Sequence, residues 1–153
     1  MTDYTLLTAQ LDALLSDESD ALANAANMTA LLYNGLDNVN WAGFYVLRGN
    51  ELVLGPFQGN TACVRIEVGK GVCGTAAASR KTQRVADVHA FAGHIACDAA
   101  SESEIVIPLI SGDRLYGVLD IDSPMRDRFT ADDQAGLEAL CRSFVARLGP
   151  EWL

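Results

Sequence analysis

Two apolar runs near the C-terminal end of the chain constrain its fold more than any other feature. The runs EIVIPLI (104–110) and LYGVLDIDS (115–123) are separated by the turn-forming tetrapeptide SGDR. A short turn between two β-rich apolar segments is typical of a β-hairpin. Because both runs are apolar along most of their length, we expect this hairpin at the centre of a sheet, covered by other elements.

Two more patterns extend the predicted sheet toward the N-terminus. The runs WAGFYVL (41–47) and ELVLGPF (51–57) are separated by Arg48, Gly49 and Asn50, which predicts a second hairpin. A further strand is expected at about residues 64–68, where the chain enters the turn GKG. Hairpins join neighbouring antiparallel strands, so the predicted sheet is antiparallel.

Helices are predicted before, between and after these strands along the sequence. Residues 4–36 predict two helices, the second ending near Gly35, and the small residues from Gly71 onward predict a short helix. The last helix begins at Thr130, a good N-cap, and is expected to stop at Gly149 and Pro150. This order of elements predicts an α+β fold in which the helices pack on one face of the antiparallel sheet.

Length and charge narrow the organisation and the partners of the chain. The 153 residues correspond to one domain, 1–153, with N-terminal helices at about 4–36 and a core at about 37–149. Twenty acidic against eleven basic residues give a net charge of -9, which repels nucleic acids and anionic membranes. The N-terminus lacks a signal-peptide pattern, and no apolar run approaches the ~20 residues of a membrane span. We therefore expect a cytoplasmic protein without nucleic-acid or membrane partners.

Three of the four cysteines lie in the segment richest in turns. Cys63 is close to Arg65, Cys73 is near a predicted helix N-terminus, and Cys97 follows His94 in the irregular stretch 87–103. A positive group or a helix N-terminus lowers the pKa of a thiol and makes it a usable nucleophile. A single buried cysteine is more often an inert hydrophobe, but three in irregular sequence favour chemistry.

A core position and a zinc site are two other interpretations of the cysteines. Cys141 lies at helical spacing with Leu137 and Phe144, which predicts a core position. A zinc site made from the other three cysteines and a histidine would satisfy tetrahedral zinc. However, the tight pair of cysteines that such sites contain is absent from this sequence, so we expect no metal.

Carboxylates and aromatic residues complete the set of candidate site residues. Asp120 and Asp122 are two apart on a predicted strand and therefore share a face, as do Trp41 and Tyr45, four apart on another. The simpler interpretations are a solvent-facing row of charges and a pair of core aromatics. Alternatively, two like charges on one face of an apolar strand suit an ammonium group. Asp98, beside Cys97, and Glu104, at a strand entrance, are further candidates.

Seven short sequence strings give the chain a family resemblance, and they occur in the order found in that family. It resembles the free methionine-(R)-sulfoxide reductases, enzymes built on a GAF domain, over nearly all of residues 20–145. The most specific match joins HIACD to the downstream SEI, and one departure is Ala92, where the family is expected to have proline. The strings are NWAGFY (40–45), GPFQG (55–59), ACVRI (62–66), GVCG (71–74), DVHAFAGHIACD (87–98), SEIVIPL (103–109) and LYGVLDIDS (115–123).

The resemblance implies an activity and a role for each candidate residue. Cys97 would attack the sulfoxide sulfur and become a sulfenic acid, Cys63 would resolve it as a disulfide, and Cys73 would be an accessory recycling thiol. Trp41 and Tyr45 would form the wall of the pocket. The three carboxylates would bind the polar end of free methionine sulfoxide or help protonate the departing oxygen; they are Glu104, Asp120 and Asp122.

The residue inventory agrees with this chemistry independently. Sulfoxide reduction needs a sulfur nucleophile, an acid and a second thiol that discharges the sulfenic acid, and candidates for all three are present. No flavin, nicotinamide or metal motif is found, so we expect no cofactor and an external electron donor, thioredoxin. The sequence is compatible with a homodimer. Two competing interpretations are a GAF module that only senses a small molecule and a cysteine-based redox sensor.

Overall fold

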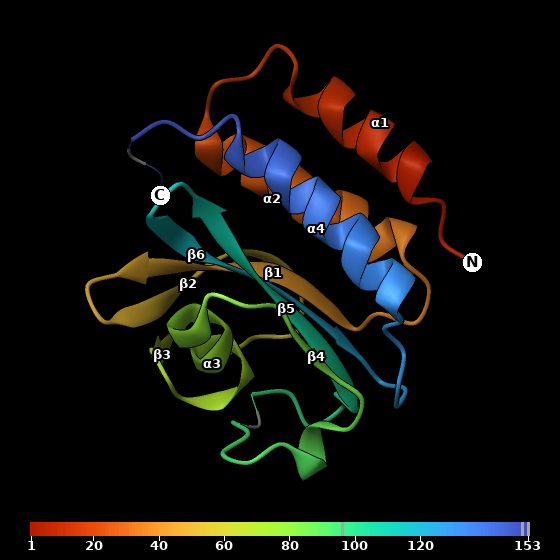
Figure 1. Cartoon of the computed structure of the whole chain (residues 1–153). Helices are drawn as coiled ribbons and strands as arrows, with labels where there is room; N and C mark the ends of the chain where they lie inside the picture. The colour runs from red at the N-terminus through yellow and green to blue at the C-terminus, as the bar shows by residue number, and fades with distance from the viewer. Residues whose placement is uncertain (96, 151, 153) are drawn as a thin grey trace.

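The computed structural model describes the chain except for residues 96, 151 and 153 (Figure 1). Its centre is a six-stranded sheet in the order β3-β2-β1-β6-β5-β4, and every neighbouring pair is antiparallel. Both predicted hairpins are present, and the C-terminal one contributes two of the four inner strands. The strands are β1 (Trp41–Arg48), β2 (Glu51–Gly59), β3 (Arg65–Glu67), β4 (Gln83–Val85), β5 (Ser103–Ser111) and β6 (Arg114–Ser123).

Three helices begin directly after a residue whose side chain caps them. Asp3 caps α1 (Tyr4–Leu15), and Asp20 caps α2 (Ala21–Gly35), each accepting a hydrogen bond from the backbone N–H three residues on. Thr130 caps α4 (Ala131–Val145) in a reciprocal capping box with Asp133, as predicted. The sequence placed the end of α4 at Gly149 and Pro150, whereas the helix ends at Val145, and three residues lie between it and Gly149.

The helices occupy both faces of the sheet, so the expectation of a single covered face is corrected. Helices α1, α2 and α4 cover one face, and α3 (Gly71–Ser79) lies against the other (Figure 1). Successive side chains of a strand point to opposite faces, so β1 serves both cores. Phe44 stacks on Phe144 of α4 with ring centroids 5.0 Å apart, whereas Tyr45 belongs to the core formed with α3.

Two short elements were not predicted, one just before the irregular stretch 87–103 and one inside it. Strand β4 contributes three residues that pair with β5, and a 3₁₀ turn, η1 (Val88–Ala90), follows it. Residues 91–95 and 97–102 then run without helix or strand along the end of the sheet on the side of α3 (Figure 1). Within the described residues, no helix is long and apolar enough to cross a membrane.

Candidate active site

A row of side chains crosses three neighbouring strands on the face covered by α3. Strand register places Trp41 of β1 opposite Asp122 of β6, and Asp122 opposite Glu104 of β5. Asp120 lies two residues before Asp122 on β6 and therefore on the same face of the sheet. All four side chains are buried, with no more than 8% of any residue exposed. The solvent-facing row of charges considered for Asp120 and Asp122 is therefore wrong, because α3 and the loop above it cover this face.

An aromatic wall closes one side of the row. Trp41 stacks on Phe57 with ring centroids 5.3 Å apart, and its indole N–H donates to the carbonyl oxygen of Asn60 at 3.0 Å. The Trp41 ring lies across Gly43, where an added Cβ would be 2.6 Å from a ring carbon. Tyr45 lies next to Trp41, with ring centroids 6.0 Å apart. The missing side chain at Gly43 is thus what allows the indole to lie flat against the sheet.

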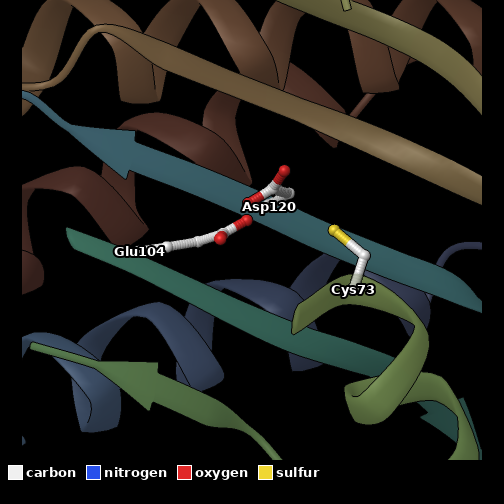
Figure 2. A group of neighbouring side chains, drawn as sticks. All are labelled: Cys73, Glu104 and Asp120. Atoms are coloured by element: carbon white, nitrogen blue, oxygen red, sulfur yellow. The ribbon is translucent and has the colours of Figure 1, made fainter. Parts of the chain in front are cut away.

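The thiol of Cys73 enters the same space from α3. Figure 2 shows Cys73 directed from α3 toward Asp120 on β6, with Glu104 reaching Asp120 from β5. Ligand atoms of Cys73, Glu104 and Asp120 lie within 4.8 Å of one another, close enough to hold a metal ion; Asp87, His89 and Glu102 form a second such group at the surface. The first group is buried and hydrogen-bonded internally, because Asp120 bonds to both Cys73 and Glu104.

Burial makes all three carboxyl groups weak acids. Desolvation, followed by the neighbouring charge of Asp122, raises the pKa of Asp120 to about 8. Desolvation and the adjacent carboxyl groups also hold the pKa values of Glu104 and Asp122 well above their usual range. The raised pKa values favour the protonated forms of these carboxyl groups, which can donate hydrogen bonds or a proton.

The other two candidate cysteines form a disulfide above this pocket. Cys63, in the connection between β2 and β3, is bonded to Cys97, and their Cα atoms are 5.4 Å apart. This is the pair that the family resemblance implied. The hydroxyl of Tyr45 donates to the carbonyl oxygen of Cys63 at 2.8 Å, which links the aromatic wall to the disulfide.

The two remaining cysteines are both buried. Cys141 packs in the core beneath α4, as its helical spacing predicted. Cys73 is 5% exposed, and desolvation together with the charge of Asp120 raises its pKa well above the usual value. The helix N-terminus was expected to favour the Cys73 thiolate, but in this position burial and the carboxyl groups outweigh it.

The pocket contains residues that the sequence pattern did not single out. Lys70, the N-cap residue of α3, and Ser101 line it beside His94 and Asp98. Lys70 stood in a GKG turn and Ser101 in an irregular stretch, so neither had a periodic signal. Asp120 Oδ1 and His94 Nδ1 are two of the buried side-chain atoms that have no hydrogen-bond partner within the described part of the chain. Both line the pocket, so a bound molecule with polar groups would satisfy them.

The fold of this chain is that of a GAF domain. The model of the GAF domain family matches residues 10–148, so the chain belongs to the GAF domain family. Within it, the chain belongs to the free methionine-R-sulfoxide reductases. It is 57% identical to the free methionine-R-sulfoxide reductase of Escherichia coli (strain K12) over 145 residues, which cover 95% of this chain and 86% of the relative.

Solved structures agree with this assignment. The structure of fRMsr of Staphylococcus aureus in complex with substrate is similar with a TM-score of 0.93 and 54% identity, covering 97% of each chain. The free methionine-R-sulfoxide reductase from Neisseria meningitidis in complex with its substrate gives a TM-score of 0.91 and 43% identity, covering 94% of this chain and 87% of that one.

Proposed function

We propose that this chain reduces free methionine-(R)-sulfoxide to methionine, with Cys97 as the nucleophile and Cys63 as the resolving thiol. The observation that carries the proposal is the Cys63–Cys97 disulfide, whose Cys97 lines a pocket that combines an aromatic wall with three buried carboxyl groups of raised pKa. The names of the relatives supply the substrate and its stereochemistry.

The proposed reaction begins with the disulfide reduced. The thiolate of Cys97 attacks the sulfur atom of the sulfoxide group while a carboxyl group protonates the sulfoxide oxygen. The S–O bond of the substrate and the transient bond between the two sulfur atoms then break as the hydroxyl group passes to Cys97. This leaves methionine and a sulfenic acid, so the substrate sulfur is reduced by two electrons and the cysteine is oxidised by two. The thiol of Cys63 then attacks the sulfenic acid, which releases water and forms the disulfide.

The pocket suits a small zwitterion whose side chain ends in a methyl group on sulfur. Trp41 and Tyr45 offer an apolar surface for the methyl group. The unpartnered Oδ1 of Asp120 is available to accept from an ammonium group, and a cation beside it would favour ionisation of the carboxyl groups. Lys70 and the first-turn N–H groups of α3 provide positive charge for the substrate carboxylate.

A thiol donor has to reduce the disulfide after each turnover. We assign this step to thioredoxin in the cytoplasm, because thiol exchange at the half-exposed Cys63–Cys97 pair requires no cofactor. Cys73 is a poor candidate for the accessory recycling thiol, since it is buried and its raised pKa disfavours the thiolate.

The test measures methionine formed from free methionine-(R)-sulfoxide with thioredoxin as reductant. Cys97→Ser should abolish turnover, whereas Cys63→Ser should form one equivalent of methionine and then stop. The same sulfoxide with a capped amine and carboxyl group should react with a kcat/KM lower by ~10⁴-fold, because the buried carboxyl groups would lose their cation. Multiple turnovers by Cys97→Ser, or equal rates for both substrates, would overturn the assignment.

A further inference from the structure

Asn40 lies where the nucleophile's loop meets the sheet. It precedes Trp41 at the start of β1, and its backbone N–H donates to the carbonyl oxygen of Asp122 at 2.9 Å. Its side-chain amide donates to the carboxylate of Asp98 and to the hydroxyl of Ser101, both at 3.3 Å. One residue therefore contacts the aromatic wall, the carboxyl row and the loop at once.

The loop segment that Asn40 binds is a closed turn directly after Cys97. The N–H of Ser101 donates to the carbonyl oxygen of Asp98 at 3.2 Å, and the N–H of Ala100 donates to Asp98 Oδ1 at 2.9 Å. Ser101 is 6% exposed, so the end of the turn is anchored in the protein. The Asn40 amide contacts the first and the last residue of this turn, and so fixes the turn as a unit.

These contacts matter most when the disulfide is open. In the oxidised chain, the bond to Cys63 holds Cys97 in place. Reduction removes that tether before the substrate can react, and Cys97 lies in a stretch without helix or strand. The position of Cys97 must then be set by non-covalent contacts of the residues next to it. Asp98 follows Cys97 in the sequence, and its hydrogen bond from Asn40 connects it to the start of β1.

We propose that Asn40 is a positioning residue, which places the Cys97 sulfur over the pocket and within reach of Cys63 after the disulfide is reduced. The inference rests on the proposed role of Cys97. The backbone and the side chain of Asn40 make separate contacts. The backbone N–H is hydrogen-bonded to Asp122 of the sheet, and the side-chain amide is hydrogen-bonded to the loop. Removing the side chain should therefore disturb the nucleophile and spare the pocket wall.

The first experiment compares the kinetics of Asn40→Ala with those of Asn34→Ala. Asn34 is a matched control because its side-chain amide also donates a hydrogen bond, but to the carbonyl oxygen of Ala30 on the exposed surface of α2. Asn40→Ala should lower kcat by roughly 10- to 100-fold, since a small misplacement of a reacting group has effects of this size, with KM changed less than about twofold. Asn34→Ala should match the wild type. An unchanged kcat, or a loss expressed only in KM, would overturn the proposal.

The second experiment needs no sulfoxide, so it separates this inference from the proposed function. The equilibrium of the Cys63–Cys97 disulfide is measured in a dithiothreitol redox buffer. Asn40→Ala should make the disulfide about tenfold easier to reduce, a shift of about 30 mV, because Cys97 is less well held near Cys63. If the wild type fails to reduce the sulfoxide while this shift is present, the proposed function fails and the positioning role stands.

A reciprocal exchange checks that the bond itself is responsible. Asn40→Asp opposes the carboxylate of Asp98 and should shift the equilibrium further than Asn40→Ala. Combining it with Asp98→Asn restores a donor facing an acceptor and should return the equilibrium most of the way to the wild-type value. Equal equilibria in the wild type and all variants, or additive effects in the double variant, would overturn the proposal.

Discussion

Asp120→Asn should make the substrate-free protein more stable at alkaline pH. The carboxyl group of Asp120 is buried in the folded chain, where its pKa is raised to about 8 from its usual value of 3.8. Between these two values the folded chain holds a proton that the unfolded chain releases. Folding then takes up a proton, so the free energy of unfolding falls as the pH rises through this window. An amide at this position has the same shape and does not titrate.

The size of the effect follows from the width of this window. Each unit of pKa difference corresponds to about 1.4 kcal/mol. Between pH 5 and pH 8, titration of Asp120 should therefore remove on the order of 4 kcal/mol from the free energy of unfolding. This is a large part of the ~5–15 kcal/mol that stabilises an ordinary domain.

Urea denaturation at pH 5 and pH 8 measures the effect. Wild type and Asp120→Asn are compared in the oxidised state, with Asp113→Asn in the exposed hairpin turn as the matched control. The wild type and the control should lose stability from pH 5 to pH 8 by the same amount, and Asp120→Asn should lose several kcal/mol less. Parallel pH profiles for all three chains would refute the argument that burial of this carboxyl group opposes folding.

Three other substitutions or treatments have defined expectations. Iodoacetamide should modify Cys73 at least ~10-fold more slowly than Cys97 in the reduced protein, because burial raises the pKa of the Cys73 thiol, and equal rates would contradict this. Cys141→Ala should cost about 1 kcal/mol in urea denaturation and leave kcat and KM unchanged; altered kinetics would place Cys141 in the site. Gly43→Ala should raise KM at least ~10-fold, because its Cβ would lie 2.6 Å from the Trp41 ring, and an unchanged KM would show that the indole can move freely.

Much of the fold could be predicted because its elements carry strong local signals. The apolar runs and turn residues located both hairpins, and Thr130 marked the start of α4 correctly. The sequence did not reveal β4, since three residues paired only along β5 have no periodicity of their own. The placement of α3 opposite the other helices was also missed. Its residues are small and show no apolar stripe that would assign it to a face.

The site was predictable where residues share a strand and not where they meet across the chain. The spacing of Asp120 and Asp122 placed them on one face, but their burial depends on α3 and on the covering loop. Lys70 and Asn40 gave no signal, because each lies next to an element's first residue and acquires its neighbours only in the folded chain. Long-range contacts of this kind require the register of β1 against β6.

The pairing of β1 with β6 also sets the order in which this protein can be built. These central strands come from opposite halves of the sequence, residues 41–48 and 114–123. While the chain leaves the ribosome, β1 can join the hairpin with β2, but its other edge stays open until β6 has been synthesised. Such distant pairings fold slowly and leave a sheet edge available for aggregation meanwhile. A chain truncated before residue 114 would therefore lack both the closing strand and the pocket, and should be a substrate for chaperones or proteases.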